Sequence, residues 1–327
     1  MHNPLQVLKH YWGYDGFRPG QAEVIDSILS GHDTLALMPT GGGKSITFQV
    51  PALANPGICL VVSPLVALMK DQVKNLQKRG ILSAFISSEM PHWEILQQLD
   101  NCILGDYKFL YISPERISSE LFQEKLKTLS RKVNLLVVDE AHCISQWGND
   151  FRRDYRLIAD IRDVIPHVQV IAVTASATAA VVADICEQLH FRKGYRIFKP
   201  SFERQNLSFV VRKTDNKLKE ICHILSAVPG SAVIYSRTRK GVEEYAGNLR
   251  AAGTSAEYFH AGLDPVLKTE RQADWVKGFT RVLVATNAFG MGIDKGDVRV
   301  VIHTEFPDSM EAYYQEAGRA GSDGKRA

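Results

Sequence analysis

The sequence contains few cysteines, and none of them has the paired spacing of a metal site. Its five cysteines stand at positions 59, 102, 143, 186 and 222, an odd number without a C-x-x-C pair. This pattern excludes a disulfide framework and a cysteine-based zinc site, and it is typical of a reducing compartment. We therefore expect no zinc site in this chain.

Long apolar runs and a secretory leader are lacking as well. The mean hydropathy is −0.12, and charged residues interrupt every apolar stretch before it is long enough to cross a bilayer. The first residues, MHNPLQVLKHYWGYDG, contain no basic stretch followed by an apolar core. The sequence therefore predicts a protein that is neither membrane-bound nor secreted.

A strong charge of one sign is also absent. The net charge is +3, so the composition permits a polyanionic partner without indicating one. Hydrophobic residues make up 45% and charged residues 23%, which excludes a disordered or collagen-like chain. At about 150 residues per domain, a chain of 327 residues predicts two domains.

The chain does contain two series of short apolar segments separated by helical patterns. Because the segments are rich in Val, Ile and Leu on both faces, they predict strands buried in parallel sheets. The fold class is therefore α/β, with two tandem, doubly wound, mainly parallel sheets that divide near residue 200 into domains 1–200 and 201–327. The predicted strands are 35–39, 58–63, 109–113, 134–140 and 168–176, then 207–213, 231–236, 255–260, 281–288 and 298–306.

A glycine-rich loop follows the first strand and precedes a helix. Glycines let backbone N–H groups converge on phosphate oxygens, Lys44 supplies a charge for the β- and γ-phosphates, and the Ser45 hydroxyl suits Mg²⁺. Met38 stands where the strict phosphate-loop pattern has glycine, and the alternative is a tight turn that ends in an exposed lysine. The loop comprises Thr40, Gly41, Gly42, Gly43, Lys44 and Ser45.

Two acids end the strand at 134–140. Asp139 is placed to hold Mg²⁺, and Glu140 is placed to orient or deprotonate the attacking water. The alternative is a pair of helix-capping acids. With a phosphate loop about 95 residues upstream in the same sheet, the pair favours nucleotide hydrolysis.

The sequence Asp139-Glu140-Ala141-His142 after TGGGKS resembles a superfamily 2 helicase motor with two RecA-like domains. Further motifs resemble the RecQ helicases over nearly the whole chain. The segment YDGFRPGQ (14–21) matches the adenine motif of that family. The resemblance implies that Tyr14, Arg18 and Gln21 bind the base, and an amide suits adenine chemically.

The same resemblance implies a DNA-binding face. The segment HCISQWGNDFRRDYRL (142–157) resembles the aromatic-rich loop of RecQ enzymes, in which Trp147 and Arg152 would contact single-stranded DNA. Its alternative is an amphipathic helix with an aromatic core face. Segments that resemble backbone-contacting turns place four further residues there: Ser63, Ser236, His260 and Asn287. In the last of these segments, TNAFGMGIDK (286–295), Asp294 would face the ribose or an opposing arginine.

Near the end of the chain, YYQEAGRAGSDG (313–324) departs from the family pattern Q-x-x-G-R-x-G-R. Gln315 and Arg319 match, but Ser322 replaces the second arginine, which is the usual finger for the γ-phosphate. Either Arg319 compensates or hydrolysis is slow. The chain ends soon afterwards, so we expect a motor core without the family's further strand, zinc subdomain and winged helix.

The resemblance implies an enzyme that uses ATP and Mg²⁺ to move 3′-to-5′ along single-stranded DNA and to unwind forked duplex DNA, in repair and recombination. It implies a location in the bacterial cytoplasm with the nucleoid, or in the nucleus; protein partners stay unassigned. One alternative is a DEAD-box-like RNA helicase, although His142 and the aromatic segment speak against it. Another is a nucleic-acid binding module that has lost turnover, as Ser322 would allow.

Overall fold

The computed structural model describes residues 2–39, 42–146, 151–175, 177–199, 204–287, 289 and 295–327. The chain divides into two compact units, Met1–Phe202 (unit 1) and Glu203–Ala327 (unit 2). Each unit contains one sheet, and every strand pairing in both sheets is parallel.

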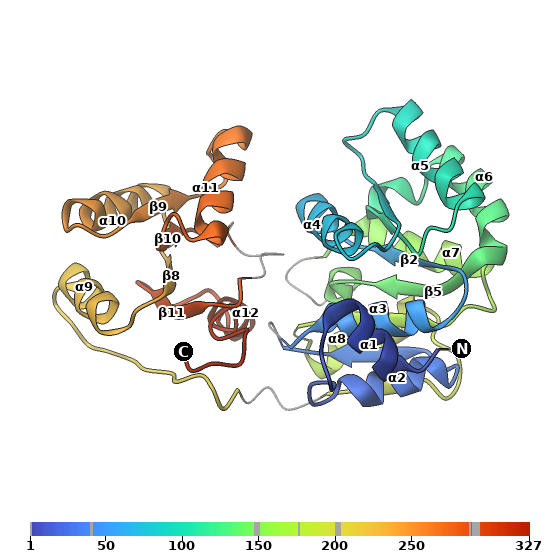
Figure 1. Cartoon of the computed structure of the whole chain (residues 1–327), viewed down its shortest axis with the longest axis horizontal. Helices are drawn as coiled ribbons and strands as arrows, with labels where there is room; N and C mark the ends of the chain where they lie inside the picture. Colours follow the sequence, from blue (N-terminus) through green and yellow to red (C-terminus); the bar gives the residue numbers. More distant parts are fainter. Residues whose placement is uncertain are drawn as a thin grey trace. The chain divides into compact units, whose positions relative to one another are not determined.

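Unit 1, in which β2 and β5 are labelled in Figure 1, is built on a seven-stranded sheet with the order β3-β4-β2-β5-β6-β1-β7. Its strands are β1 (Thr34–Leu37), β2 (Ile58–Val62), β3 (Ser83–Ile86), β4 (Phe109–Ile112), β5 (Val133–Val138), β6 (Val170–Thr174) and β7 (Arg196–Phe198). Its helices are α1 (Pro4–Trp12), α2 (Gln21–Leu29), α3 (Lys44–Ala54), α4 (Val66–Gln77), α5 (His92–Leu104), α6 (Glu120–Leu129), α7 (Ile158–Val164) and α8 (Ala179–Gln188). Short 3₁₀ helices span Pro114–Arg116, Ser130–Lys132, Ala141–Ile144 and Arg153–Leu157.

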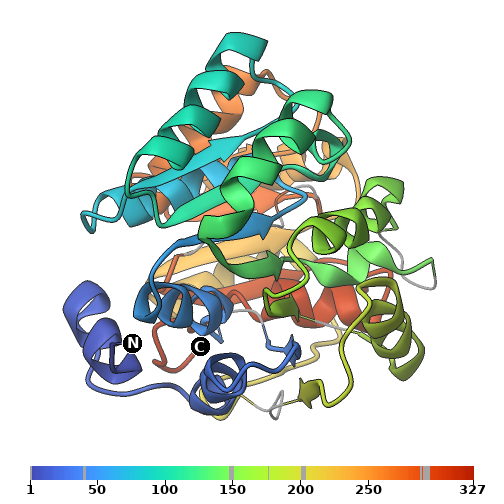
Figure 2. The same ribbon diagram turned by 90° about the vertical axis from the view of Figure 1, so that its right-hand side faces the viewer.

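Both faces of this sheet are covered by helices. Along β2, Leu60 and Val62 pack into one core, while Cys59 and Val61 pack into the other. Helices α5, α6, α7 and α8 complete the first core and α2, α3 and α4 the second; α5 and α6 lie side by side in Figure 2. Because successive side chains of a strand point to opposite faces, a strand buried on both faces is apolar at every position.

Unit 2 repeats this plan with a four-stranded sheet of order β11-β8-β10-β9. One core joins Ile234 and Val284 to α9 and α10, and the other joins Val233 and Leu283 to Trp275 of α11. Its strands are β8 (Ser231–Tyr235), β9 (Ala256–Phe259), β10 (Val282–Ala285) and β11 (Val298–His303). Its helices are α9 (Lys217–Ala227), α10 (Arg239–Ala251), α11 (Pro265–Lys277) and α12 (Met310–Ala317).

Several helices begin at side chains that cap their first turn. Asn3, Ser119, Thr178, Thr238 and Asp264 each accept a hydrogen bond from a backbone N–H of the helix that follows. A cap of this kind contributes about 1 kcal/mol, because it satisfies a donor that has no partner within the helix. These helix starts are therefore specified locally by the sequence.

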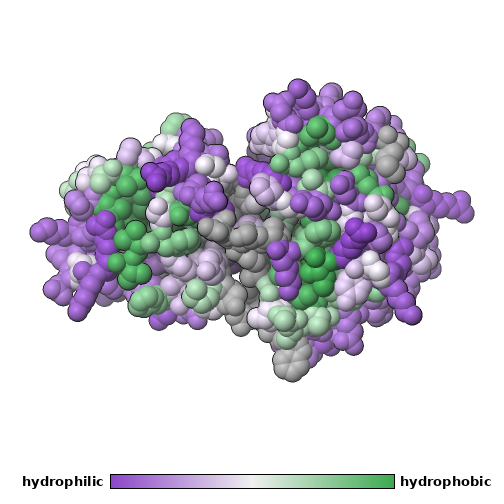
Figure 3. Space-filling view, turned by 90° about the horizontal axis from the view of Figure 1, so that it is seen from below, coloured by the Kyte–Doolittle hydropathy of each residue, from purple (hydrophilic) through white to green (hydrophobic). Residues whose placement is uncertain are grey.

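The predicted fold class is confirmed, since both units are parallel sheets with helices on both faces. The prediction of a strand at 207–213 was wrong, because this segment joins neither sheet. Its side chains are largely exposed, Val211 to 85%, and apolar groups reach the surface of unit 2 in Figure 3. Strands β3 and β7 were not predicted, because β3 begins with the small residues Ser83 and Ala84 instead of a run of Val, Ile and Leu, and β7 has only three residues and is largely exposed.

No helix in the described part of the chain is both long and apolar enough to cross a membrane.

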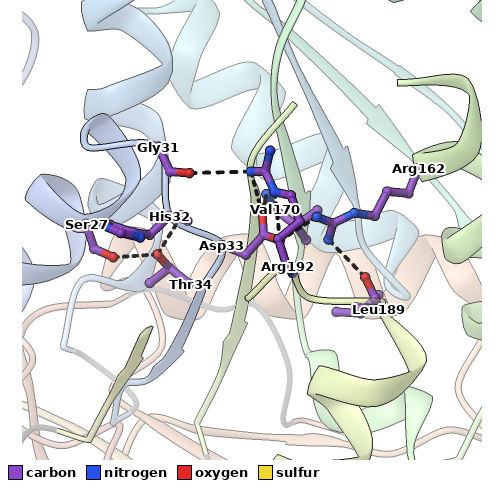
Figure 4. Close-up of polar contacts among 9 residues, drawn as sticks. All are labelled: Ser27, Gly31, His32, Asp33, Thr34, Arg162, Val170, Leu189 and Arg192. Carbon is purple, nitrogen blue, oxygen red and sulfur yellow. Dashed lines mark hydrogen bonds and ion pairs between the residues drawn. The ribbon is translucent and has the colours of Figure 1, made fainter. Parts of the chain in front are cut away.

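At the amino end of β1, a buried carboxylate joins three parts of unit 1 (Figure 4). Asp33 is 1% exposed and forms ion pairs with Arg162 of α7 and with Arg192, which follows α8; Arg192 Nη2 lies 2.9 Å from Asp33 Oδ1. The Val170 N–H also donates to Asp33, at 3.0 Å. Burial alone would raise the pKa of Asp33, but the hydrogen bonds from Arg192, Arg162 and Val170 outweigh it and hold the pKa below its ordinary value.

We expect Asp33→Asn to lower the free energy of unfolding by about 3–5 kcal/mol at neutral pH, because it leaves two cations without their buried partner. A carboxyl whose pKa is lowered by folding stabilises the protein above its unfolded pKa, and this contribution disappears as the pH falls through the folded pKa. The difference between the parent and the variant should therefore shrink below about pH 4.

Chemical denaturation at a series of pH values measures this difference. Asp15→Asn is the matched control, because Asp15 pairs with Lys9 at 2.9 Å while both side chains are exposed. An exposed pair contributes about 0–1 kcal/mol. Equal effects of the two substitutions would contradict the prediction.

Candidate functional site: a phosphate loop beside paired acids

The predicted catalytic residues of unit 1 gather at the carboxyl edge of its sheet. Strands β2, β5, β6 and β1 are consecutive neighbours there, and the polar residues that follow them converge. The carboxyl edge of an open parallel sheet is where such folds bind their ligands. The residues at this edge are Ser63 after β2, Asp139 and Glu140 after β5, Thr174 at the end of β6, and Lys44 after the loop that follows β1.

The described part of the glycine loop requires glycine at its last position. Gly43 has a φ of +75°, and a Cβ there would lie 2.5 Å from Gln21 Nε2. Lys44 begins α3 directly after it. The glycine backbone of the loop therefore lies directly before the N-terminus of α3. Exposed backbone N–H groups at a helix N-terminus are the arrangement that binds phosphate. Thr40 and Gly41 lie outside the described residues.

Lys44 is not the exposed lysine of a simple turn. Its Nζ lies 3.0 Å from Glu140 Oε1, and the side chains are only 19% and 8% exposed. Glu140 Oε2 lies 3.4 Å from His142 Nδ1, which shares a hydrogen bond of 2.8 Å with Thr174 Oγ1. A chain of polar contacts therefore runs from the phosphate loop through the acids to the end of β6.

Glu140 has a left-handed backbone conformation, with a φ of +47°. A non-glycine residue in this region is strained, and such strain is common at functional sites.

Asp139 lies half-buried beside the buried Glu140. Its Oδ1 accepts the Glu140 N–H at 2.9 Å, and its Oδ2 lies 3.4 Å from the Ser63 hydroxyl. The buried Tyr155 hydroxyl donates to the Asp139 carbonyl at 2.9 Å. Burial and the neighbouring Glu140 charge raise the pKa of Asp139 to about 6, although Lys44 and the hydrogen bonds from the Glu140 N–H and the Ser63 hydroxyl act in the opposite direction.

These residues fit ATP and Mg²⁺ chemically. Among the described residues, no group of three or more His, Cys, Asp or Glu side chains is arranged to hold a metal ion. Mg²⁺ does not require such a cage, because it is usually held by one or two carboxylates together with substrate phosphates. Asp139 would supply the carboxylate, and Ser45, the second residue of α3, would supply a hydroxyl beside Lys44.

The three predicted adenine-binding residues differ in their surroundings. Tyr14 is 52% exposed and Arg18 is also exposed, whereas Gln21 is 3% exposed. The Gln21 amide donates to the carbonyls of Gly42 and Gly43, each at 3.1 Å, and accepts the Arg18 N–H at 2.9 Å. Gln21 therefore ties the adenine motif to the phosphate loop, a contact that the sequence did not predict.

Of the residues predicted to bind DNA in unit 1, Ser63 begins the turn after β2, and the Arg152 side chain contacts that turn. Ser63 is 1% exposed, and Arg152 Nη1 donates to the carbonyl of the next residue, Pro64, at 3.1 Å. Trp147 lies outside the described residues. The described end of the aromatic segment forms the 3₁₀ helix Arg153–Leu157 instead of a longer amphipathic helix.

In unit 2, three predicted DNA-binding residues follow neighbouring strands. Ser236 follows β8, His260 follows β9 and Asn287 follows β10, so all three lie at the carboxyl edge of that sheet. Asn287 is exposed, whereas Ser236 and His260 are 7% and 5% exposed. His260 Nε2 lies 2.9 Å from Glu243 Oε1, a partner that the sequence did not suggest.

The last predicted motif begins in α12 and continues in the turn after it. Gln315 is half-buried in the helix, and Arg319 is 6% exposed in the turn. Arg319 forms a hydrogen bond with Tyr235, whose pKa burial raises to about 12 while the Arg319 charge acts in the opposite direction. The Ser322 hydroxyl donates to the Arg319 carbonyl at 3.2 Å. Asp294 lies outside the described residues.

Comparison with known families agrees with this arrangement. The model of the DEAD/DEAH box helicases matches residues 18–185, which is the region that contains the glycine loop and the paired acids. The chain belongs to the DEAD/DEAH box helicase family. The model of the helicase conserved C-terminal domain matches residues 216–324, within unit 2.

Curated relatives confirm the resemblance to RecQ helicases. The ATP-dependent DNA helicase RecQ of Bacillus subtilis is 42% identical over 99% of this chain and 55% of its own length. A protein of Acanthamoeba polyphaga mimivirus, named as an ATP-dependent RNA helicase, is 40% identical over 98% of this chain and 59% of its own length. The chain spans about half the length of the first curated relatives it matches.

A solved structure shows the same fold at much lower identity. Mss116p bound to single-stranded RNA and AMP-PNP matches 100% of this chain and 71% of its own, with a TM-score of 0.78 and 18% identity. This likeness supports the two RecA-like units and carries no argument about the substrate of this chain.

Proposed function

We propose that this chain is the motor of an ATP-dependent DNA helicase, which uses ATP and Mg²⁺ to move along single-stranded DNA and to separate duplex strands. The observation that carries the proposal is the convergence of Lys44, Asp139 and Glu140 behind a glycine loop, in a chain of this family. As an enzyme that acts on DNA, it would work in the bacterial cytoplasm with the nucleoid, or in the nucleus.

Each residue of the cluster has a distinct role in this proposal. Lys44 neutralises charge on the β- and γ-phosphates, while Ser45 and Asp139 hold Mg²⁺. Glu140 orients the attacking water and accepts its proton. Because Lys44 is paired with Glu140 at 3.0 Å, a phosphate that attracts Lys44 would release the Glu140 carboxylate for this task.

The remaining predicted residues contact ATP or DNA. Tyr14, Arg18 and Gln21 bind the adenine, and Asp294 binds the ribose or an arginine. Ser63, Trp147, Arg152, Ser236, His260 and Asn287 contact DNA. Arg319 and Gln315 act on the phosphates from unit 2, and Thr40, Gly41, Gly42 and Gly43 form the phosphate loop.

ATP hydrolysis measured with single-stranded DNA, with single-stranded RNA and without nucleic acid tests the proposal. We expect stimulation by DNA above stimulation by RNA. Forked duplexes with a 3′ or a 5′ single-stranded tail then test the polarity, and 3′-to-5′ movement requires the 3′ tail. Hydrolysis that no nucleic acid stimulates would contradict the proposal.

A second candidate is an RNA helicase, which the name of the mimivirus relative favours. Stronger stimulation by RNA in the same assay would select it. A third candidate is a nucleic-acid binding module with weak or lost turnover, which Ser322 favours. DNA binding without measurable hydrolysis would select the third.

We expect Trp147→Ala to leave hydrolysis without DNA nearly unchanged and to weaken stimulation by single-stranded DNA. Stacking of one base on an aromatic ring contributes about 1–3 kcal/mol, which raises the DNA concentration for half-maximal stimulation by about fivefold or more. A DNA titration of the ATPase rate measures this shift. Trp93→Ala, on α5 and 66% exposed, is the matched control and should not change the titration. A large fall in the melting temperature of Trp147→Ala would assign Trp147 to the core instead.

A further inference from the structure

Arg204, near the beginning of unit 2, donates hydrogen bonds to the turn that carries Arg319. Arg204 Nη1 donates to the Gly318 carbonyl at 3.2 Å, and Nη2 donates to the carbonyls of Ala320 and Gly321 at 3.1 and 2.7 Å. These carbonyls belong to residues on both sides of Arg319. The backbone that carries Arg319 is therefore held before and after it by one guanidinium group.

Asn206 adds further hydrogen bonds to the same turn. We call Arg204, Asn206 and the turn 318–321 together the Arg204 clamp. The Asn206 side chain accepts a hydrogen bond from Arg204 Nε at 3.2 Å and donates to the carbonyls of Gly321 and Lys325 at 2.9 and 2.8 Å. The contact is so close that a Cβ on Gly321, whose φ is +58°, would lie 2.4 Å from Asn206 Nδ2. The clamp therefore requires glycine at position 321.

The chemistry of the clamp favours a fixed geometry. A guanidinium is a planar fork, so several hydrogen bonds from it define the positions of their acceptors. Gly318 directly follows α12, and a cation at a helix C-terminus is stabilised by the exposed carbonyls. Arg319 itself is buried, so a shift of its backbone moves the guanidinium within a packed environment.

We propose that Arg204 is a positioning residue for Arg319, with Asn206 holding Arg204 in place. This inference rests on the proposed function, in which Arg319 acts on the phosphates of ATP. Arg204 lies one residue after the start of unit 2. The clamp therefore ties the first described residues of unit 2 to the turn that carries Arg319, 114 to 117 positions later in the chain.

The test compares the DNA-stimulated ATPase of Arg204→Gln with that of the parent. A misplacement of about 1 Å in a catalytic group costs up to about a hundredfold in rate, so we expect kcat to fall by about tenfold or more. The KM for ATP should change by less than about twofold, because Arg319 meets charge that develops in the transition state. Arg204→Lys keeps the charge but not the fork and should give an intermediate kcat.

Arg281 provides a matched control in the same unit. It also donates hydrogen bonds to three backbone carbonyls, those of Gly230 at 3.0 Å, Val228 at 2.9 Å and Leu225, which lie in the last turn of α9 and just after it, where there is no predicted site residue. Arg281→Gln should lower the melting temperature about as much as Arg204→Gln while leaving kcat unchanged. An equal loss of kcat in both folded variants would reduce the clamp to a structural role.

Arg319→Ala, alone and combined with Arg204→Gln, tests the proposed role of Arg319 separately from the positioning role of Arg204. If Arg319→Ala leaves kcat unchanged, the role of Arg319 in the proposed function is wrong. If Arg319→Ala lowers kcat and Arg204→Gln then adds a further, independent loss, the positioning role is wrong. The expected result is that Arg204→Gln lowers kcat only while Arg319 is present. Should Arg204→Gln not fold, Asn206→Ser replaces it in the same comparison, with a smaller loss of kcat.

Discussion

Lys44→Ala should lower steady-state ATP hydrolysis by about a hundredfold or more, because it removes a preorganised charge from the transferring phosphate. The structure strengthens this expectation. Lys44 begins the helix that follows the glycine loop, and its Nζ lies 3.0 Å from the carboxylate proposed to act on the attacking water. The substitution therefore removes the phosphate contact and changes the charge beside Glu140.

The measurement is the ATPase rate with saturating single-stranded DNA, together with the melting temperature. Because Glu140 is largely buried, loss of its lysine also lowers stability, and a second variant must separate the two effects. Lys44→Ala with Glu140→Gln removes both charges and should recover stability without recovering hydrolysis. Lys125→Ala is a control, since Lys125 also forms a partly buried ion pair, with Asp100 at 2.7 Å. Unchanged hydrolysis in folded Lys44→Ala would refute the assignment of the ATP site.

Much of the fold could be predicted because its signals are local. Strands buried on both faces are continuously apolar, so β2 and β5 stand out as runs of Val, Ile and Leu. The strand predicted at 207–213 shows the limit of that signal. Its residues have the composition of a strand, but whether a segment joins a sheet depends on a neighbour elsewhere in the chain.

The candidate site also has one part that could be predicted from the sequence and another that could not. The loop and the acids could be predicted because each is a contiguous motif, and sheet topology then brings their residues to one edge. The contact of Gln21 with the loop and the grip of Arg204 on residues 318–321 could not be predicted. The partners of Arg204 lie 114 to 117 positions away in the sequence, and no local pattern marks such a pair.

Ser322→Arg tests the position at which the sequence departs from the family pattern. An arginine finger is worth on the order of a thousandfold in turnover, and serine cannot supply its charge. We expect Ser322→Arg to raise the DNA-stimulated kcat by about tenfold or more with little change in the KM for ATP. The reason is that a finger interacts with charge that develops in the transition state and not in the ground state.

The surroundings of Ser322 determine whether the longer side chain fits. Ser322 is half-buried, and the hydrogen bond from its hydroxyl to the Arg319 carbonyl, at 3.2 Å, contributes about 1 kcal/mol. On one side, Gly324 has open space around it. On the other, Gly321 is packed against Asn206, so the turn is not open throughout. The new side chain therefore has to extend away from the Arg204 clamp.

The decisive measurement is kcat and KM for ATP at saturating single-stranded DNA, for the parent, Ser322→Arg and Ser322→Ala. Ser322→Ala removes only the hydroxyl, and we expect it to match the parent, so that any gain in Ser322→Arg belongs to the guanidinium. Ser322→Lys adds a charge without the planar fork and should gain less. If folded Ser322→Arg shows an equal or lower kcat, the charge at the γ-phosphate already comes from another group. Arg319 is then the first candidate, and Arg319→Ala in the Ser322→Arg background would show it by losing the turnover that the parent has.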